Sequence, residues 1–424
     1  MTLCMGRAAS LQGQLRPPSD KSLTHRALML GAISRGPCVI DRPLTGEDAL
    51  ATMRCLSALG PTFEWSRADQ VKVYPADEWS QPTEPLDCGN SGTTMRLLAG
   101  LLASRELDVT LVGDASLSRR PMKRIGEPLR LMGATVEGDT PPLRIRGGAL
   151  RGIDYTTPVA SAQIKSAILL AGLGATGETW VTEPHLSRDH TERMLNALGV
   201  PVTRQGLRVG VSAGQPDSFY FTVPADISSA AFFLVAATLL PEAQLELLDV
   251  GVNPTRTGVL DVLAQTGMTV VREEERDEMG EPVANLVINR HPAFLQPFTI
   301  EGDLVPRLID EIPVLAVLAT QCDGVSRIRD AGELRVKESD RIELVANGLR
   351  AMGADVETYP DGMAIQGPVR LKAASIDCHG DHRIGMAFAI AALIADGETR
   401  IEGSEAIATS YPSFEKDLWS VLIV

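Results

Sequence analysis

The sequence lacks several features that would point to secretion, a membrane or a disulfide-stabilised fold. Its six cysteines are scattered without a CxxC pair, so we expect reduced thiols in a cytoplasmic protein. Residues 1–10 contain no apolar segment of the kind found in signal peptides, and we expect none. The longest apolar run, 230–240, is shorter than the about 20 residues that a bilayer span requires. It predicts a buried helix instead.

The sequence also has no surplus of positive charge, since its formal net charge is −14 at pH 7. Binding to nucleic acid depends on an excess of Lys and Arg, so this balance argues against a nucleic-acid partner. An anionic substrate would need a local positive cleft in an acidic protein. The remaining composition, 44% hydrophobic and 22% charged, is that of an ordinary globular protein, and 424 residues predict two domains.

A short pattern recurs five times along the sequence. An apolar helical stretch ends at a glycine, and alternating residues typical of a strand follow it. The glycines stand at positions 60, 133, 199, 267 and 353. These intervals are longer than the about 20–50 residues of solenoid repeats, so each unit is predicted to be a small α/β subdomain. Three units lie in the first half, two follow, and the two chain ends together could supply a sixth.

We therefore expect two α/β domains of three subdomains each. Crossings between them are expected where a proline-containing segment meets a capped helix, which gives a first domain of 17–225 and a second of 1–16 plus 226–424. The two domains could close over a ligand at such a hinge. No long linker is visible. Residues 272–281 are interpreted as a charged turn with no evident chemistry.

The stretch 16–26 is the one around which the chain is organised. Two prolines fix an extended approach, and a side-chain oxygen from residues 19–20 can cap the helix that follows. Lys21, Ser22 and Arg26 lie at its N-terminal end, where free N–H groups, a hydroxyl and two cations can hold a phosphate. The alternative is a surface helix with a solvated basic face. Its predicted buried residues are Leu23, Ala27, Leu30 and Ile33.

Two further stretches of the first half could bind an anion. Residues 87–96 form a glycine-rich loop that runs into a helix and lacks the lysine of a P-loop, so a plain turn is the alternative. Residues 119–124 carry four cations, whose mutual repulsion a nearby anion would relieve. A solvated loop would have the same sequence.

Two helix starts follow. Ser161 is placed to cap a helix, and Gln163 could hydrogen-bond a hydroxyl-bearing ligand, although capping alone would explain the serine. Arg188 puts another cation on the first turn of the next helix. His190 could contact a ligand there, but we interpret it as an exposed imidazole.

The second half contains two charged clusters. Asp310 and Glu311 stand in an apolar run, where a raised pKa would suit a general base, although Asp310 could equally be a helix N-cap. Lys337, Glu338 and Arg341 have spacings that let them converge on one face. An acid held among cations suits proton transfer beside an anionic substrate, and an ordinary ion-paired helix surface is the alternative.

Residues 378–383 raise the question of a metal site, because a cysteine and two histidines lie close together. A zinc site needs three or four ligands in a workable geometry, and no partner motif stands elsewhere in the sequence. We therefore expect a helix start that carries Arg383 on its first turn, and no metal.

Taken together, these stretches resemble the 5-enolpyruvylshikimate-3-phosphate (EPSP) synthases, the enolpyruvyl transferases of the shikimate pathway to chorismate and the aromatic amino acids. The match follows the family's order from Lys21 to Pro412. Its most specific pieces are residues 20–26, 89–93, 336–341 and 381–383. Patterns that look like those of the class II branch are 120–124, 161–165, 188–192 and 253–256.

The resemblance implies an α/β fold of two similar domains, each of three βαβαββ repeats around inward helices, described as an inside-out α/β barrel. It implies an active site in the interdomain cleft. The first domain would form the shikimate 3-phosphate side, and the second much of the phosphoenolpyruvate side. We expect a cytoplasmic monomer without cofactor or metal, inhibited by glyphosate, and with no membrane partner.

The resemblance also assigns residues to the two substrates. Those expected to hold shikimate 3-phosphate are Lys21, Ser22, Arg26, Ser161, Gln163, Arg188, Asp310 and Lys337. Those expected to hold phosphoenolpyruvate are Lys21, Gly92, Arg120, Gln163, Arg341 and Arg383.

The implied reaction adds the 5-hydroxyl of shikimate 3-phosphate to C2 of phosphoenolpyruvate while C3 takes a proton, and then expels phosphate. It needs a base for the hydroxyl, an acid for C3, and cations for the leaving phosphate. We assign Asp310 as the base, Glu338 as the acid and base at C3, and Lys21 with the arginines as electrostatic stabilisers.

The sequence departs from the family pattern in two places. Glu333 stands where many members carry Asn, and Thr409 replaces a lysine of class I members at a position that varies in class II. Gly92 is the common residue where some strongly glyphosate-tolerant enzymes have Ala. An expectation of tolerance therefore rests on the class II motifs.

Two other functions compete with this one. UDP-N-acetylglucosamine enolpyruvyltransferases share the fold and the donor, but usually carry a reactive Cys on the loop that corresponds to 119–124, and this chain has no cysteine between Cys88 and Cys322. A non-catalytic binding protein on the same scaffold would be expected to have lost Lys21 or the carboxylates, and they are present. Fold alone would not separate these functions.

Overall fold

The computed structural model describes residues 1–289 and 294–423, and it divides into two compact units. Unit 1 consists of Met1–Pro18, Pro224–Arg276 and Pro282–Val424, and unit 2 of Ser19–Val223 and Asp277–Glu281. Each unit has its own core of buried apolar side chains. Among the described residues, no helix has the length and the apolar character that crossing a membrane requires.

Unit 2 contains three four-stranded sheets that share one pattern of pairing. In each sheet the first pair of neighbours is parallel and the other two pairs are antiparallel. In order of neighbours, the sheets are β16 (Tyr220–Thr222), β3 (Cys38–Asp41), β5 (Gln70–Tyr74) and β4 (Thr62–Arg67); β6 (Leu86–Asp87), β7 (Asp108–Val112), β9 (Leu143–Arg146) and β8 (Thr135–Glu137); and β11 (Asp154–Thr156), β13 (Thr179–Thr182), β15 (Arg208–Val211) and β14 (Val202–Gln205). The short strands β10 (Leu150–Arg151) and β12 (Ala175–Thr176) pair separately.

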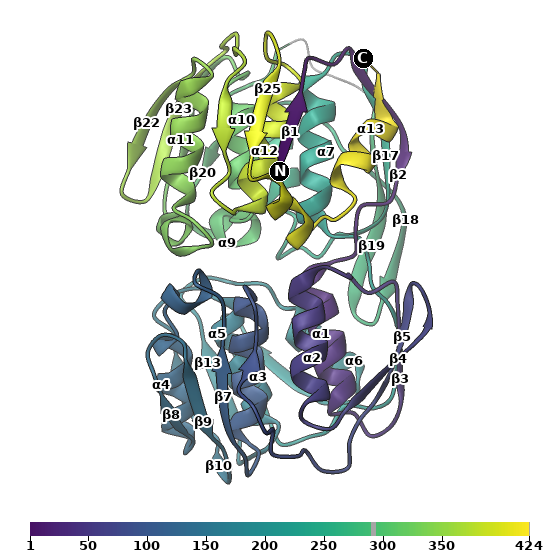
Figure 1. Cartoon of the computed structure of the whole chain (residues 1–424), viewed down its shortest axis with the longest axis vertical. Helices are drawn as coiled ribbons and strands as arrows, with labels where there is room; N and C mark the ends of the chain where they lie inside the picture. Colours follow the sequence, from purple (N-terminus) through teal and green to yellow (C-terminus); the bar gives the residue numbers. More distant parts are fainter. Residues whose placement is uncertain (290–293, 424) are drawn as a thin grey trace. The chain divides into compact units, whose positions relative to one another are not determined.

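Two helices accompany each of these sheets. They are α1 (Lys21–Ala32), α2 (Glu47–Ser57), α3 (Gly92–Ala103), α4 (Lys123–Met132), α5 (Ala162–Gly172) and α6 (His190–Ala197). Almost every side chain of α1, α3 and α5 is buried, whereas α2 and α4 keep an exposed face. Figure 1 shows the strands β7, β8 and β9 beside α3 and α4. The second and third sheets follow the chain order βαβαββ, and the first borrows β16 from the end of the unit.

Unit 1 is also built of helices and small sheets, and it takes strands from both ends of the chain. Among its described residues, only the four-stranded sheet has the pairing pattern of unit 2. Its sheets, in order of neighbours, are β18 (Val271–Glu278), β19 (Glu281–Ile288), β17 (Gln244–Gly251), β2 (Ser10–Leu15) and β26 (Leu422–Ile423); β20 (Thr299–Ile300), β21 (Gly324–Ile328), β23 (Gly362–Gly367) and β22 (Asp355–Tyr359); and β1 (Thr2–Met5), β25 (Thr399–Glu402) and β24 (Ser375–Asp377). The tip of the hairpin of β18 and β19, Asp277–Glu281, belongs to unit 2. Its helices are α7 (Ile227–Leu239), α8 (Gly258–Gln265), α9 (Val305–Leu308), α10 (Ile312–Ala319), α11 (Arg341–Ala351), α12 (His382–Ala392) and α13 (Phe414–Val421).

The structure confirms the predicted fold class of two similar halves built from βαβαββ repeats. All five glycines of the recurring pattern have a positive φ, which is the backbone conformation that ends a helix at glycine. The apolar run 230–240 falls almost wholly in α7, which is buried as predicted.

The interpretation of residues 272–281 as a charged turn is wrong. They form most of β18 and the start of β19, with the turn at Met279 and Gly280. The strand β18 is an edge strand whose side chains are nearly all exposed, so its charges meet water while its backbone pairs with β19. Local sequence does not separate such a strand from a solvated turn.

Candidate active site

The helix α1 begins as the sequence predicts. The Asp20 carboxylate accepts a hydrogen bond from the Leu23 N–H at 2.8 Å and caps the helix. The four predicted residues of its apolar face are buried, and so are Thr24, His25 and Arg26. A solvated basic face is therefore wrong for Arg26, which is only 4% exposed.

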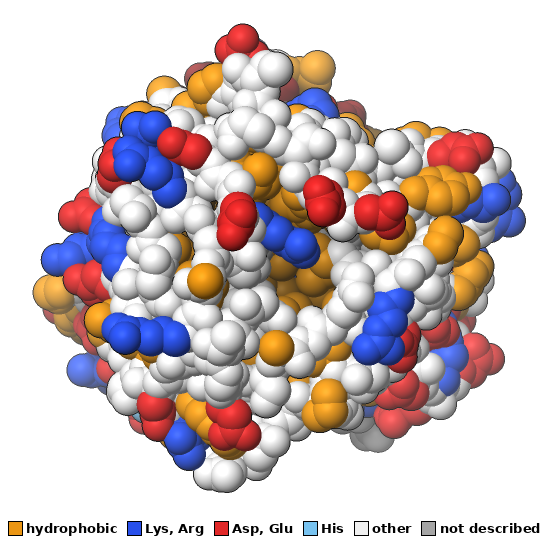
Figure 2. All heavy atoms as spheres, turned by 90° about the horizontal axis from the view of Figure 1, so that it is seen from below, with side chains coloured by type: hydrophobic (Ala, Val, Ile, Leu, Met, Phe, Trp, Pro, Cys, Tyr) orange, Lys and Arg blue, Asp and Glu red, His pale blue; other side chains and the backbone are white. Residues whose placement is uncertain are grey.

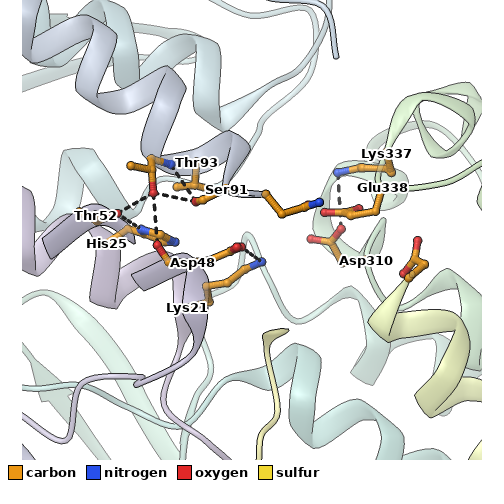
Figure 3. Close-up of polar contacts among 12 residues, drawn as sticks. Lys21, His25, Asp48, Thr52, Ser91, Thr93, Asp310, Lys337 and Glu338 are labelled. Carbon is orange, nitrogen blue, oxygen red and sulfur yellow. Dashed lines mark hydrogen bonds and ion pairs between the residues drawn. The ribbon is translucent and has the colours of Figure 1, made fainter. Parts of the chain in front are cut away.

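Lys21 lies on the first turn of α1 and is held by a carboxylate. Its Nζ lies 3.0 Å from Oδ2 of Asp48 on the first turn of α2 (Figure 3). The two side chains are 17% and 9% exposed, so water screens this pair less than a surface ion pair. The ammonium is thus in a fixed place.

A chain of hydrogen bonds joins α1, α2 and α3, and Figure 3 labels His25, Thr52 and Ser91 among its members. His25 Nδ1 of α1 lies 2.7 Å from the Thr52 hydroxyl of α2, which lies 2.7 Å from the Thr94 hydroxyl of α3. The Thr94 hydroxyl also reaches the Asp48 carbonyl at 3.3 Å and the Ser91 hydroxyl at 2.7 Å. Burial, and after it the charges of Lys21 and Arg26, lower the pKa of His25 well below its ordinary value. The imidazole is therefore neutral near pH 7.

Arg26 crosses from α1 to the third repeat of unit 2. Its Nε donates to the Thr191 hydroxyl at 2.8 Å, and its Nη2 to the Ser166 hydroxyl at 2.9 Å. Burial lowers the pKa of Arg26 to about 10, so the guanidinium keeps its charge at neutral pH.

The start of α3 lies next to two guanidinium groups. A Cβ atom added to Gly92 would stand 3.3 Å from Nη1 of Arg120 and 3.3 Å from Nη1 of Arg96. Arg120 donates to Oδ1 of Asn90, and Arg96 donates to Oε1 of Gln163, each at 2.5 Å. Loop 87–96 and the basic stretch 119–124 thus meet at one place in unit 2, as an anion site would require.

In unit 1 a buried guanidinium gathers three carboxylates. Arg341, at the start of α11, lies 2.6 Å from Oε2 of Glu338, 2.8 Å from Oδ2 of Asp381 and 3.4 Å from Oδ1 of Asp310. Burial alone would lower its pKa, but Asp381 and Glu338 outweigh burial and raise the pKa of Arg341 above its ordinary value. The guanidinium is a permanent cation.

Lys337 completes this cluster, with its Nζ 3.5 Å from Oδ1 of Asp310 (Figure 3). Asp310 therefore stands between two cations. The alternative that it caps a helix is wrong, because α10 begins at Ile312 and its N-cap is Glu311. Lys337 and Glu338 precede α11, so the loop before the helix, and not helical spacing, makes them converge.

The remaining predicted residues lie at helix starts. Arg383 follows Asp381, whose carboxylate accepts the Arg383 N–H at 3.0 Å and caps α12. Ser22 lies on the first turn of α1, and its carbonyl accepts from Arg26 at 3.0 Å. Arg188 is half-buried in the loop before α6.

The structure corrects two sequence interpretations at helix starts, one in part and one wholly. Ser161 stands at the N-cap position of α5 as predicted, but its side chain makes no capping hydrogen bond; the backbone N–H of Ser161 instead donates to Oε1 of Glu183 at 3.1 Å. His190 is buried, with Nδ1 2.8 Å from Oε1 of Glu281. Glu281 lies 91 positions away in sequence, so local sequence around His190 does not reveal this partner.

Figure 2 shows charge of mixed sign on one face of the molecule. On the face drawn in Figure 2, acidic and basic side chains are interspersed and no broad patch of one sign is visible. Within the part of the chain that the structure describes, no group of three or more His, Cys, Asp or Glu side chains is placed to hold a metal ion.

The chain matches one family along nearly its whole length. A family model for EPSP synthase (3-phosphoshikimate 1-carboxyvinyltransferase) matches residues 6–418. The chain belongs to the EPSP synthase family. Relatives named 3-phosphoshikimate 1-carboxyvinyltransferase include one from Geobacillus kaustophilus, 50% identical over 98% of each chain. Another, from Desulfitobacterium hafniense, is 49% identical over 97% of this chain and 94% of its own length.

Solved structures agree with this membership. The EPSP synthase from Acinetobacter baumannii superposes with a TM-score of 0.89 at 42% identity, covering 100% of this chain and 98% of that one. The enolpyruvyl transferase NikO from Streptomyces tendae has a TM-score of 0.81 at 18% identity, covering 99% and 97%, and shows likeness of fold alone.

Sequence reasoning missed two carboxylates of this candidate site. Asp48 holds Lys21, and fully buried Asp381 holds Arg341 across 40 positions of sequence. Asp381 lies in the motif 381–383 that carries the family resemblance, but the sequence did not reveal that it pairs with Arg341. Asp48 opens a helix of ordinary composition and left no comparable signal.

Proposed function

We propose that this chain performs the reaction of its family with the residues gathered at the starts of α1, α3 and α11. The chain is a 3-phosphoshikimate 1-carboxyvinyltransferase of the shikimate pathway. It transfers the enolpyruvyl group of phosphoenolpyruvate to the 5-hydroxyl of shikimate 3-phosphate and releases phosphate.

Proton transfer is assigned to the carboxylates around Arg341. Asp310 enters this step as the carboxylate and Glu338 as the neutral carboxylic acid. Asp310 takes the proton of the 5-hydroxyl as the oxygen adds to C2, and Glu338 gives its proton to C3. Phosphate then leaves as Glu338 takes a proton back from C3. The observation that carries this assignment is the contact of both carboxylates with one buried guanidinium, Asp310 at 3.4 Å and Glu338 at 2.6 Å. Carboxylates so fixed need little reorganisation during the reaction.

The two substrates are assigned to different sets of residues. For shikimate 3-phosphate, the set is Lys21, Ser22, Arg26, Ser161, Gln163, Arg188, Asp310 and Lys337. For phosphoenolpyruvate, it is Lys21, Gly92, Arg120, Gln163, Arg341 and Arg383. The guanidinium groups of Arg96 and Arg120 both lie beside Gly92, and Arg96 donates to Gln163. These contacts support the assignment of Gly92, Arg120 and Gln163 to the same substrate. Lys21, fixed by Asp48, would serve both substrates and stabilise charge on the leaving phosphate.

Further properties follow from the family and remain proposals. We propose that the active site uses residues of both units, because the assigned residues fall in both. Closure of the two domains over a ligand stays a prediction. The protein is proposed to be a cytoplasmic monomer that glyphosate inhibits weakly.

Replacing Glu338 by Gln tests the catalytic assignment. The amide keeps the shape and a hydrogen bond to Arg341 but cannot exchange a proton, so turnover should fall by about 100-fold or more. Dissociation constants of both substrates should change much less. The measurement is kcat beside ligand binding by calorimetry, with Glu343→Gln on the exposed side of α11 as a matched control. Near-normal turnover of Glu338→Gln would remove Glu338 from the mechanism.

A further inference from the structure

A buried ionic cluster in unit 2 has no part in the mechanism above. Lys165 on α5 is 0% exposed, and its Nζ lies 2.7 Å from Oε2 of Glu183 and 2.9 Å from Oε1 of Glu192. Both glutamates are buried as well. Burial by itself would lower the pKa of Lys165, but Glu192 and Glu183 raise it above its ordinary value, so the ammonium stays charged.

Of the two glutamates, Glu183 also binds the surrounding backbone. Its Oε1 accepts the Ser161 N–H at 3.1 Å, and its Oε2 accepts the Ser187 N–H at 3.4 Å. Lys165 also binds the second loop, since its Nζ donates to the Ser187 carbonyl at 3.4 Å. The carboxylate and the ammonium together hold the backbone at two loops.

Glu183 can bind the backbone of both loops because of its place in the fold. It directly follows β13, whose end lies where α5 begins and where the loop to α6 departs. The three N–H groups of Lys165 match three acceptors: Glu183, Glu192 and the Ser187 carbonyl. The residues that the two loops present are Ser161 itself and Arg188, the neighbour of Ser187.

A contribution to stability does not explain such a cluster well. Taking an ammonium and two carboxylates out of water is costly, and well-packed apolar residues in their place often stabilise a protein as well or better. Ion pairs of this kind are better attested as devices that fix geometry. Here the geometry fixed is that of two loops that carry proposed substrate ligands.

We propose that the Lys165–Glu183 pair is a positioning device for shikimate 3-phosphate. It fixes the backbone at Ser161 and Ser187, and so places the Ser161 hydroxyl and the Arg188 guanidinium. Neither Lys165 nor Glu183 touches the substrate. This inference rests on the proposed assignment of Ser161 and Arg188 as ligands.

The test compares Glu183→Gln with Glu192→Gln. Each variant removes one buried carboxylate charge from beside Lys165, but the two loop amides donate to Glu183. In Glu183→Gln, one of the two accepting oxygens becomes an amide nitrogen, which cannot accept a backbone N–H. We expect the Kd and KM of shikimate 3-phosphate to rise about tenfold in Glu183→Gln, the size expected for a lost charged hydrogen bond at a loop. In Glu192→Gln both should stay within about twofold.

Other readouts separate positioning from general loosening. The KM for phosphoenolpyruvate and kcat at saturation should change less than the KM for shikimate 3-phosphate. Similar losses in melting temperature for both variants, with a binding defect only in Glu183→Gln, would support the inference. Unchanged shikimate 3-phosphate binding by folded Glu183→Gln would overturn it.

Two more sets of variants keep the test decisive. Glu183→Asp retains the charge for Lys165 but is one methylene too short to reach both amides, so it carries the test if Glu183→Gln does not fold, with the same expected rise in Kd. Ser161→Ala and Arg188→Ala test the ligand assignment itself. If both bind shikimate 3-phosphate normally, the assignment fails and this inference fails with it; if they bind weakly while both Glu183 variants bind normally, only this inference fails.

Discussion

At the scale of single residues, the proposed catalytic cations Lys21 and Arg341 are each held by carboxylates. Lys21 is held by Asp48, and Arg341 by Asp381 as well as by Glu338 and Asp310. Cations gathered for anionic substrates would otherwise repel one another. The carboxylates offset that repulsion and fix each charge in place. An arriving phosphate or carboxylate group then meets cations that need little rearrangement.

Gly92 gives a residue-scale prediction. An added methyl group would stand 3.3 Å from the guanidiniums of Arg120 and Arg96, so both must shift in Gly92→Ala. Crowding of this kind costs ~1 kcal/mol or more, which predicts a rise of about fivefold or more in the KM for phosphoenolpyruvate. Glyphosate inhibition should weaken by more than that.

Glyphosate inhibition of the parent enzyme is measured in the same experiment as that of Gly92→Ala. Gly6→Ala is the matched control, because a Cβ at Gly6 meets nothing within 4 Å. Unchanged phosphoenolpyruvate kinetics in Gly92→Ala would contradict the placement of Gly92 in the site. Inhibition of the parent at low micromolar glyphosate would contradict the proposed tolerance.

At the scale of elements, α1, α2 and α3 are joined by side chains as well as by apolar packing. The His25–Thr52–Thr94 chain links one buried residue of each helix, near the ends that carry Lys21, Asp48 and Gly92. Polar groups inside a core are costly unless paired, so this chain favours one alignment of the three helices.

Replacing Thr52 by Val tests this link. The change keeps the side-chain shape but leaves His25 Nδ1 and the Thr94 hydroxyl without their partner in the middle of the chain. We expect a loss of about 1–3 kcal/mol in the free energy of unfolding. Urea denaturation followed by circular dichroism measures it, and Thr52→Ser, which keeps the hydroxyl, should lose less. Equal free energies of unfolding for Thr52→Val and the parent protein would show that these hydrogen bonds do not stabilise the packing of the three helices.

The elements also show what sequence reasoning can and cannot reach. The cap at Asp20 and the buried face of α1 were predictable because both depend on residues within a few positions. The hydrogen bond of His190 to Glu281 was not, since its partner lies 91 positions away on the hairpin of β18 and β19. For the same reason the contact of Arg341 with Asp381 left no local signal, although motif resemblance marked both stretches.

At the scale of the whole molecule, repetition in the sequence revealed the architecture. Five helix-ending glycines revealed five repeats, because the backbone at each of these helix ends has a positive φ, which favours glycine. The exchange of strands between distant segments was not predictable in detail. The strand β16 completes the first sheet of unit 2, and β1 and β2 complete sheets of unit 1. Pairings over such separations depend on the assembled fold and leave no pattern near either strand.

The most direct measurement of the central claim is phosphate release by the purified protein. One reaction contains phosphoenolpyruvate with shikimate 3-phosphate, and another contains phosphoenolpyruvate with UDP-N-acetylglucosamine. The account predicts release in the first reaction only, and a loss of about 100-fold or more in Glu338→Gln. Release with UDP-N-acetylglucosamine, or no release with either acceptor from a protein that unfolds cooperatively, would contradict it.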